Sequence, residues 1–284
     1  MEPRYALVEF AGPDALTFLQ AQLATDLRRV DDLRWQWAAL CAIDGRAVAT
    51  GALIRASAQQ WLWLLRADLA PALAEHLRKF QLRSKLTIEP PKPAYLRAEK
   101  RIPRPDLDQQ LQRIERIDQE QWLLVNLPQG WSLTVSTVDA DENVNGLMDW
   151  EDARLSRGML MINHLCSGEH LALALELHRL RAVSVSKGCY PGQEIIARTH
   201  YRGKSKRSLA LLDAAPSSLQ VGDRVEAEGQ TIGTVLEIAQ SGLALAEVST
   251  SAFASKQWTC GGTDLSWRTP DLPEPASTQL TGNS

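Results

Sequence analysis

The octapeptide Lys-Gly-Cys-Tyr-Pro-Gly-Gln-Glu at residues 187–194 is where side chains able to do chemistry lie closest together in this sequence. The thiol of Cys189 is two residues from the ammonium group of Lys187, and a nearby cation favours the thiolate, the reactive form of cysteine. The two glycines let the backbone approach a ligand closely, and Pro191 restricts the backbone further, so we predict a shaped loop. The alternative is a tight turn around a buried, inert cysteine.

Cys189 could act as a nucleophile, as the acceptor of a one-carbon unit, or as a transient ligand of iron. Iron–sulfur clusters normally use about four cysteine ligands, and no second cysteine lies near Cys189 in the sequence, so we expect no resident metal. A cysteine hydrolase would need a histidine that activates the thiol. His178 and His200 are near in sequence, but neither belongs to a recognisable protease pattern, which disfavours that class.

The composition is that of a globular protein with a sizeable core: 284 residues, 44% of them hydrophobic, and a net charge of −3. The N-terminal residues lack the order of a signal peptide, and no apolar run approaches the roughly 20 residues that a membrane span needs. The four cysteines are scattered and form no CxxC pair, which favours a reducing, cytoplasmic compartment. The slightly acidic balance argues against nucleic-acid binding over the whole surface.

The elements that must position the octapeptide begin with an alternation of short strands and helices. Asp44-Gly45 predicts a hairpin between two strands, and Gly12-Pro13 predicts the start of a helix. Asp68 is a suitable N-cap for a second helix. The expected strands are residues 5–10, 34–42, 46–55, 61–65 and 85–89, which together indicate an α+β unit with a mainly antiparallel sheet.

The remaining sequence divides into three parts. Residues 90–110 hold five prolines and many charges and indicate a connector before strands at 122–126 and 131–137. Short, evenly spaced strands in the third part, at 208–212, 224–227, 231–239 and 243–248, predict a small β-barrel or sandwich. We therefore expect an α+β protein with an N-terminal unit at 1–110, a second unit carrying the octapeptide at 111–206, a small β-barrel at 207–270 and a disordered tail at 271–284.

The octapeptide resembles the K-G-C-[FY]-x-G-Q-E signature of YgfZ-type folate-binding proteins, which are relatives of the glycine-cleavage aminomethyltransferase, the T-protein. The similarity continues through Ile195-Ile196-Ala197-Arg198 and Tyr201-Arg202-Gly203-Lys204, and it includes Gly12-Pro13-Asp14-Ala15 and the segment from Trp150 to Gly158. The resemblance implies a T-protein-like cloverleaf of two α/β sheet units and a small C-terminal β-barrel around a central folate site. It also implies tetrahydrofolate or a derivative, polyglutamylated or not, as the cofactor.

The resemblance further implies a role as an accessory factor rather than an enzyme. Such a factor supports the assembly or repair of iron–sulfur enzymes, including those that modify tRNA by thiolation. Its partners would be folate and these enzymes, with no membrane and no direct contact to nucleic acid.

The resemblance places Cys189 and Lys187 at the reactive centre and makes Tyr5 and Trp150 the aromatic wall for a flat pterin ring. Lys187 could instead be a solvated turn residue, and Glu194 an acid that interacts with a helix dipole. The cationic residues after the octapeptide could hold a folate tail, contact RNA phosphates or simply be solvated. The expected folate contacts are Tyr5, Trp150, Gly188, Tyr190, Gly192, Gln193, Glu194, Arg198 and Arg202.

The chain departs from its relatives at two places. T-proteins carry two aspartates after the hairpin glycine, one of them catalytic, where this chain has Ala49-Thr50, and this counts against ordinary aminomethyl transfer. Ala172-Leu173 and Glu176-Leu177 stand where YgfZ-type relatives tend to carry Pro-Gln and Asn-Leu. A true folate-dependent aminomethyl- or methyltransferase remains the alternative, and a non-catalytic interaction module whose octapeptide is purely structural is a third hypothesis.

Overall fold

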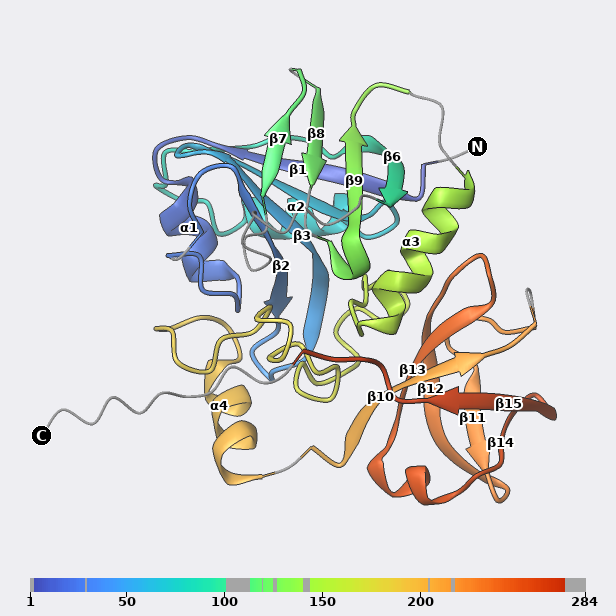
Figure 1. Ribbon diagram of the computed structural model, residues 1–284. Helices are drawn as coiled ribbons and strands as arrows, with labels where there is room; N and C mark the ends of the chain where they lie inside the picture. Colours follow the sequence, from blue (N-terminus) through green and yellow to red (C-terminus); the bar gives the residue numbers. More distant parts are fainter. Residues whose placement is uncertain are drawn as a thin grey trace, which may run out of the picture.

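The computed structural model describes residues 3–28, 30–100, 113–118, 120–124, 127–139, 144–203, 205–215 and 218–273. A large curved sheet lies at one end of the molecule and a closed barrel at the other, with helix α3 beside both (Figure 1). The fold is therefore α+β, as the sequence predicts.

The large sheet has nine strands, eight of them in the order β2-β3-β4-β1-β6-β9-β8-β7, while β5 pairs with β1. Its ends approach each other, because the amide of Ile114 in β7 donates to the carbonyl of Leu33, just before β2, at 2.9 Å. The sheet thus curls almost into a closed shape with an inner face. Its strands are β1 Tyr5–Ala11, β2 Arg34–Cys41, β3 Ala47–Ser57, β4 Gln60–Arg66, β5 Thr87–Ile88, β6 Lys92–Lys100, β7 Ile114–Arg116, β8 Gln121–Leu124 and β9 Trp131–Ser136.

Strand β6 corrects the prediction of a connector at residues 90–110. It pairs with β1 on one side and with β9 on the other, so the two expected α/β units share one continuous path of paired strands. Its alternate residues Ala94, Leu96 and Ala98 are buried, and this apolar alternation outweighs the nearby prolines. Residues 101–112 of the expected connector lie outside the described residues.

The described helices of more than one turn are α1 Ala15–Gln22, α2 Ala70–Arg78, α3 Val144–Ser156 and α4 Gln193–Arg202, and short 3-10 turns lie at Pro128–Gly130 and Thr250–Ala254. The predicted cap of α2 is wrong: Leu69 is the N-cap residue, and the carboxylate of Asp68 instead accepts hydrogen bonds from the backbone amide and Nδ1 of His164. None of the helices in the described ranges is long and apolar enough to cross a membrane.

The predicted C-terminal barrel is confirmed as a closed barrel in the order β10-β13-β12-β11-β14-β15. Its small core contains stacked Trp258 and Trp267, whose ring centroids are 4.4 Å apart. The last two strands are short and are separated by consecutive glycines, so the sequence pattern does not predict them. The barrel strands are β10 Arg207–Asp213, β11 Arg224–Ala227, β12 Gln230–Ile238, β13 Leu243–Ser249, β14 Trp258–Cys260 and β15 Thr263–Arg268.

The start of the expected disordered tail is in fact held against the rest of the protein. The amide of Asp271 donates to the carbonyl of Ser156 at 2.7 Å, and Arg179 donates to the carbonyls of Leu272 and Pro273. Residues 271–273 therefore belong to the folded structure, and residues 274–284 lie outside the described ranges.

A buried ion pair joins α3 to the barrel. Arg154 of α3 lies 2.7 Å from the carboxylate of Glu237 in β12, and both side chains are almost fully buried. The same carboxylate accepts the amide of Met161 at 2.8 Å. Removal of either charge would leave the other buried without a partner, which is far more costly than loss of an exposed pair.

We expect Glu237→Ala to lower the free energy of unfolding by about 3–5 kcal/mol, the usual cost of stranding a buried charge. Asp213→Ala is the matched control, because Asp213 pairs with Arg268 in the same barrel with both side chains half exposed; its cost should stay below about 1 kcal/mol. Urea unfolding of the full chain measures both, and equal losses would contradict the assigned role of the buried pair.

Candidate functional site

The octapeptide leads into α4, and Gly192 fixes how that helix begins. Gly192 is the N-cap residue of α4 and has a φ of 82°, a conformation that favours glycine. A Cβ atom at this position would lie 2.3 Å from the carbonyl oxygen of Ala42 and 3.0 Å from Gly45. Both neighbours belong to the β2–β3 hairpin, so glycine is required here for α4 to pack on the hairpin turn.

Lys187 is buried and anchors the octapeptide to the N-terminal part of the chain. Its Nζ donates to the carbonyl oxygens of Gln20 at 2.6 Å, Leu23 at 2.6 Å and Thr25 at 2.8 Å. Because these contacts use all three N–H bonds of the ammonium group, none is left for a thiolate or a folate carboxylate. The structure therefore corrects the predicted reactive role of Lys187: this side chain holds the loop. Burial lowers its pKa to about 8.

Two further side chains of the octapeptide fix its shape. The hydroxyl of Tyr190 donates to the carbonyl of Ser184 at 2.6 Å, and the side-chain amide of Gln193 donates to the carbonyl of Lys187 at 2.7 Å. The amide of Ser184 in turn donates to the carbonyl of Ala24. Tyr190 and Gln193 therefore hold the loop itself together, at positions where the resemblance predicts folate contacts.

Cys189 is the exposed thiol of the loop. Cys41, Cys166 and Cys260 are buried, whereas Cys189 is exposed, and Gly188 beside it is open to solvent. The alternative prediction that Cys189 is buried is therefore wrong. The anchored neighbours of Cys189 hold its thiol at the surface.

Glu194, Arg198 and Arg202 are exposed along α4. Glu194 lies in the first turn of the helix and Arg202 in the last, which matches the favourable interaction of acids and bases with the helix dipole. Neither arginine forms an ion pair with a residue that the structure describes. Lys204, part of the same predicted cationic strip, lies outside the described residues.

Tyr5 and Trp150, which the resemblance assigns to one wall, do lie together. Tyr5 comes from β1 and Trp150 from α3, and their rings pack edge to face with centroids 6.3 Å apart. Both side chains are buried. Guanidinium groups lie over both rings, those of Arg4 and Arg66 over Tyr5 and that of Arg154 over Trp150. The indole N–H of Trp150 is buried and has no hydrogen-bond partner among the described residues.

Glu151 is a residue at this aromatic pair that the sequence did not single out. Its buried carboxylate accepts a hydrogen bond from the Tyr5 hydroxyl and lies 2.8 Å from the guanidinium of Arg4. Burial, with the nearby charge of Glu151, raises the pKa of Tyr5 well above its usual value. In the sequence, Glu151 is recognisable only as a carboxylate next to Trp150. The fold shows that this carboxylate is buried.

Thr50 stands where the resemblance predicts one of the two aspartates of T-proteins. Its hydroxyl donates to the carbonyl of Leu160 at 2.6 Å and accepts the amide of Ile162 at 3.0 Å. The hydroxyl therefore holds two main-chain segments together and does not titrate near neutral pH. At the other departure, Ala172 and Leu177 are buried in the core, which is the packing role that apolar residues there suggest.

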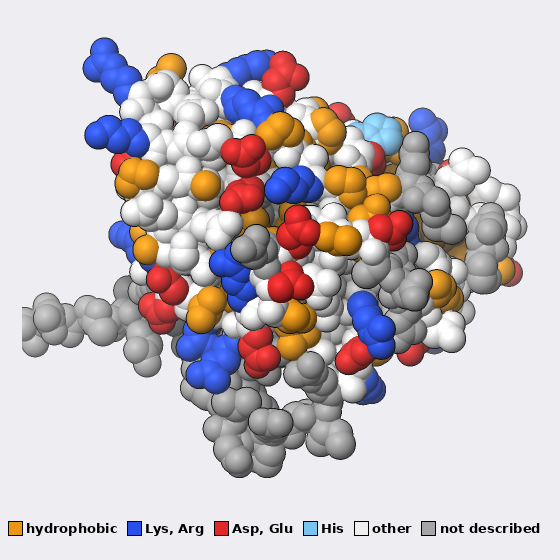
Figure 2. All heavy atoms as spheres, turned by 90° about the horizontal axis from the view of Figure 1, so that it is seen from above, with side chains coloured by type: hydrophobic (Ala, Val, Ile, Leu, Met, Phe, Trp, Pro, Cys, Tyr) orange, Lys and Arg blue, Asp and Glu red, His pale blue; other side chains and the backbone are white. Residues whose placement is uncertain are grey.

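The face above the large sheet carries no uniform charge. In Figure 2 acidic and basic side chains alternate across this face, with hydrophobic side chains scattered among them. Among the residues that the structure describes, this face therefore lacks the continuous basic patch that nucleic-acid binding uses.

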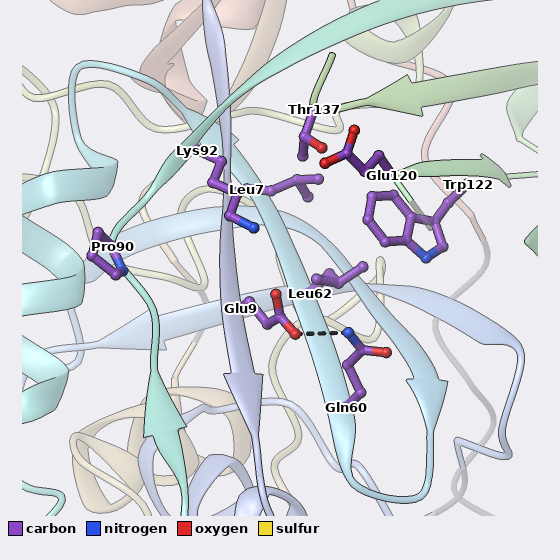
Figure 3. A pocket seen from close by; sticks show the side chains of 9 residues that line it. All are labelled: Leu7, Glu9, Gln60, Leu62, Pro90, Lys92, Glu120, Trp122 and Thr137. Atoms are coloured by element: carbon purple, nitrogen blue, oxygen red, sulfur yellow. Dashed lines mark hydrogen bonds between the residues drawn. The ribbon is translucent and has the colours of Figure 1, made fainter. Parts of the chain in front are cut away.

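A pocket of about 210 Å³ lies on the inner face of the large sheet (Figure 3). Leu7 and Glu9 project into it from β1, on the same face of that strand as Tyr5. The sequence did not reveal this pocket because its residues come from separate strands. They are Leu7, Glu9, Gln60, Leu62, Pro90, Lys92, Glu120, Trp122 and Thr137.

Metal-binding side chains do not gather anywhere in the described ranges. No group of three or more His, Cys, Asp or Glu residues there has the arrangement of a metal site. The chemistry of the described site therefore rests on the thiol of Cys189, the aromatic pair and the pocket.

We expect Lys187→Met to destabilise the protein by about 3 kcal/mol at pH 7, because three buried carbonyl oxygens lose their donor. The unfolded chain holds the Lys187 proton up to its ordinary pKa of 10.5, whereas the folded chain releases it near 8. The stability of the wild-type protein relative to Lys187→Met should therefore rise as pH increases from about 8 to 10.5 and be lost again as pH falls.

Urea unfolding at several pH values measures this difference, with Lys206→Met as the control because Lys206 is exposed. A difference between wild type and Lys187→Met that stays constant across this pH range would contradict the assigned burial of the ammonium group.

Comparison of the fold with solved structures gives one informative neighbour. The aminomethyltransferase T of the glycine cleavage system from Bartonella henselae superimposes with a TM-score of 0.69, covering 95% of this chain and 84% of the other, at 15% sequence identity. At that identity the likeness shows a shared fold and no more. The T-protein-like fold implied by the octapeptide is thereby confirmed.

Comparison of the sequence points the same way, although no family model matches it. The chain is 28% identical to the tRNA-modifying protein YgfZ of Pectobacterium carotovorum over 259 residues, covering 83% of this chain and 78% of that protein. It is 27% identical to the protein of the same name from Escherichia coli O157:H7 over 242 residues, covering 78% and 74%. The chain is thus a distant homologue of the tRNA-modifying protein YgfZ, built on the fold of the glycine-cleavage T-protein.

Proposed function

We propose that this protein is a cytoplasmic, folate-binding accessory factor that supports the assembly or repair of iron–sulfur enzymes, including tRNA-modifying ones. It would bind its client enzymes through protein–protein contacts, and the thiol of Cys189 would be its functional group. The single observation that carries this proposal is the octapeptide loop, which uses its other side chains to hold one thiol at the surface.

The loop supports the proposal because its parts have separable tasks. Lys187, Tyr190 and Gln193 are engaged in hydrogen bonds to the main chain, and Gly192 seats α4 on the hairpin. Cys189 is exposed at their centre. A loop that served packing alone would gain nothing from an exposed thiol, since cysteine used only for packing is normally buried.

Tetrahydrofolate is the cofactor that this fold and these relatives suggest. Tyr5 and Trp150 are the aromatic pair that the resemblance assigns to the pterin, and the indole N–H of Trp150 has no acceptor among the described residues. Arg198 and Arg202 are free of ion pairs with described residues and have the charge to bind the glutamate tail. When bound, the folate would supply a one-carbon carrier; the protein residues would bind and orient it.

An aminomethyltransferase is disfavoured by Thr50. General acid–base catalysis needs a group that exchanges a proton near the operating pH, and the hydroxyl of Thr50 is committed to the main chain of residues 160 and 162. Ala49 beside it is buried and apolar. The position that handles a proton in T-proteins therefore holds no titratable side chain here.

The folate assignment predicts that Trp150→Phe weakens tetrahydrofolate binding about tenfold, because the phenyl ring keeps the aromatic packing but removes the unpartnered N–H. Titration calorimetry on the full chain measures the affinity. Trp267→Phe, in the barrel, is the matched control and should leave the affinity unchanged. Equal affinities for wild type and Trp150→Phe would remove Trp150 from the site, and no binding of tetrahydrofolate to the wild type would end the folate proposal.

The role of Cys189 predicts that Cys189→Ala binds tetrahydrofolate like the wild type but no longer supports client enzymes. Thiolated nucleosides in tRNA, measured by mass spectrometry in a strain that lacks this protein, should be restored by the wild type and not by Cys189→Ala or Cys189→Ser. Restoration by both variants would favour an interaction module with a structural loop. Turnover of a one-carbon donor by the purified wild type would favour a transferase.

A further inference from the structure

Exposed hydrophobic side chains gather around the first turn of α4. Three of those exposed in the described ranges, Ile43, Leu171 and Ile195, come from segments that meet at Gly45. A Cβ atom at Gly45 would lie 3.2 Å from the side chain of Ile195, and the carbonyl of Gly45 accepts the amide of Ala172 at 3.0 Å. Ile43, in the turn of the β2–β3 hairpin, is 84% exposed. Exposed apolar side chains that cluster, unlike scattered ones, mark interaction surfaces.

The outward side of α4 continues this surface. Its exposed residues are Glu194, Ile195, Arg198, Tyr201 and Arg202. Their spacing places them on one side of the helix, opposite the buried Ile196. We call this side of α4, together with Ile43 and Leu171, the α4 face. Tyrosine and arginine are over-represented among the residues that carry the binding energy of protein interfaces, so the composition of the α4 face suits a protein partner.

Tyr201 is held in place although it is 63% exposed. Its ring packs on that of His200, with centroids 5.0 Å apart. His200 packs in turn on His178, at 5.6 Å, and His178 belongs to the segment before the octapeptide. An aromatic side chain that is already ordered loses little conformational freedom on binding. Tyr201 therefore has the properties of an interface anchor.

The charge of the α4 face determines which partner fits it. Arg198 and Arg202 form no ion pair within the described part of the chain, and arginine binds carboxylates through paired, charge-assisted hydrogen bonds. RNA also binds arginine, but the exposed carboxylate of Glu194 lies on the same face and repels a chain of phosphates. The apolar side chains of Ile43 and Ile195 add contacts that phosphates cannot use. Charge complementarity therefore favours an acidic, partly apolar segment of a protein.

The α4 face leads directly to the exposed thiol. Gly192, the N-cap residue of α4, lies three positions after Cys189, and α4 lies beside the turn of the β2–β3 hairpin (Figure 1). The helix has 10 residues and is therefore about 15 Å long, by the rise of an α-helix. A partner segment that lies along α4 has one end close to Cys189.

We infer that the α4 face docks an acidic, partly apolar segment of another protein and thereby brings that protein to Cys189. Carboxylates of the segment would pair with Arg198 and Arg202. Its apolar side chains would pack on Tyr201 and Ile43. The inference rests on the proposed function for its purpose, because it names the surface that meets the client protein. The docking itself is measured with a defined peptide and needs no client activity.

The test uses two synthetic peptides of about 15 residues, long enough to form a helix. Both have leucine at helical spacing, and the positions between hold glutamate in one peptide and glutamine in the other. Each carries a cysteine with a 2-thiopyridyl disulfide, placed at the first residue in one version and at the last in a second. The thiolate of Cys189 attacks the peptide sulfur, a protein–peptide disulfide forms, and pyridine-2-thiolate leaves and takes up a proton as the coloured thione.

We expect the glutamate peptide to release thione at least about tenfold faster than the glutamine peptide, because docking raises the concentration of the disulfide at the thiol. The reaction is run on the full chain at about 0.15 M salt, which screens unspecific attraction. Cys189→Ala should release none, since the other three cysteines are buried.

Variants place the peptide on the α4 face. Arg198→Ala and Tyr201→Ala should each slow the reaction of the glutamate peptide about tenfold, the size of one interface anchor. Both side chains are exposed, so neither change threatens folding. Arg224→Ala, at an exposed position of the barrel strand β11, is the matched control and should react like the wild type.

Four results would overturn the inference. The first two are equal rates for the two peptides, and equal rates for Arg198→Ala and Arg224→Ala with the glutamate peptide. The third is displacement of the glutamate peptide by oligouridine, which would make the α4 face an RNA surface. The fourth is an Arg198→Ala variant that binds tetrahydrofolate more weakly but captures the glutamate peptide as fast as the wild type, which would assign this arginine to the folate tail.

The proposed function fails separately from this docking surface. If the two peptides react equally but only a chain with Cys189 restores thiolated nucleosides in tRNA, the proposed function is retained and the docking surface is lost. If the glutamate peptide docks on the α4 face but Cys189→Ala also restores the nucleosides, the docking surface is retained and the proposed function is lost.

Discussion

The ammonium group of Lys187, enclosed by three main-chain carbonyl oxygens, is the contact on which the candidate site depends. It joins residues 20–25, at the end of α1, to a loop more than 160 positions later, since the contact with Gln20 spans 167 residues. Thr25 reinforces the connection, because its hydroxyl donates to the carbonyl of Ala182. The position of the loop is therefore set by the N-terminal unit, and the thiol of Cys189 is presented by the large sheet as much as by its own segment.

This contact also explains why the octapeptide sequence alone does not predict the position of the Lys187 side chain. From sequence, a lysine two residues before a cysteine indicates an activated thiol. The fold turns the lysine inward, where charge-assisted bonds to carbonyl oxygens satisfy it. Sequence could identify the octapeptide, since its glycines, proline and thiol are unusual together. The sequence could not show which way each side chain points. The partners of Lys187 lie in α1 and just after it, and those of Gly192 lie in the β2–β3 hairpin.

The elements themselves were largely predictable where local patterns act alone. The hairpin at Asp44-Gly45 and the barrel strands follow from turn residues and apolar alternation. The sequence does not predict β6 because Pro90 and Pro91 directly precede it and Pro93 lies within it, although Pro93 is tolerated near the start of the strand. The pocket could not be predicted at all. Its residues come from β1, β4, β6 and β8 and from the segments beside β6, β8 and β9, which only pairings between distant segments bring together.

The thiol of Cys189 in the candidate site is open to solvent. The hydroxyl of Thr50 is hydrogen-bonded to the main chain at Leu160 and Ile162, so this interior position, where the resemblance predicts a catalytic aspartate, holds no titratable side chain. The exposed thiol of Cys189 is the reactive group that the loop leaves accessible. The thiol lies at the surface, and the buried anchors of the loop hold it there. An exposed thiol of this kind is accessible to another protein, which is what the proposed accessory role requires.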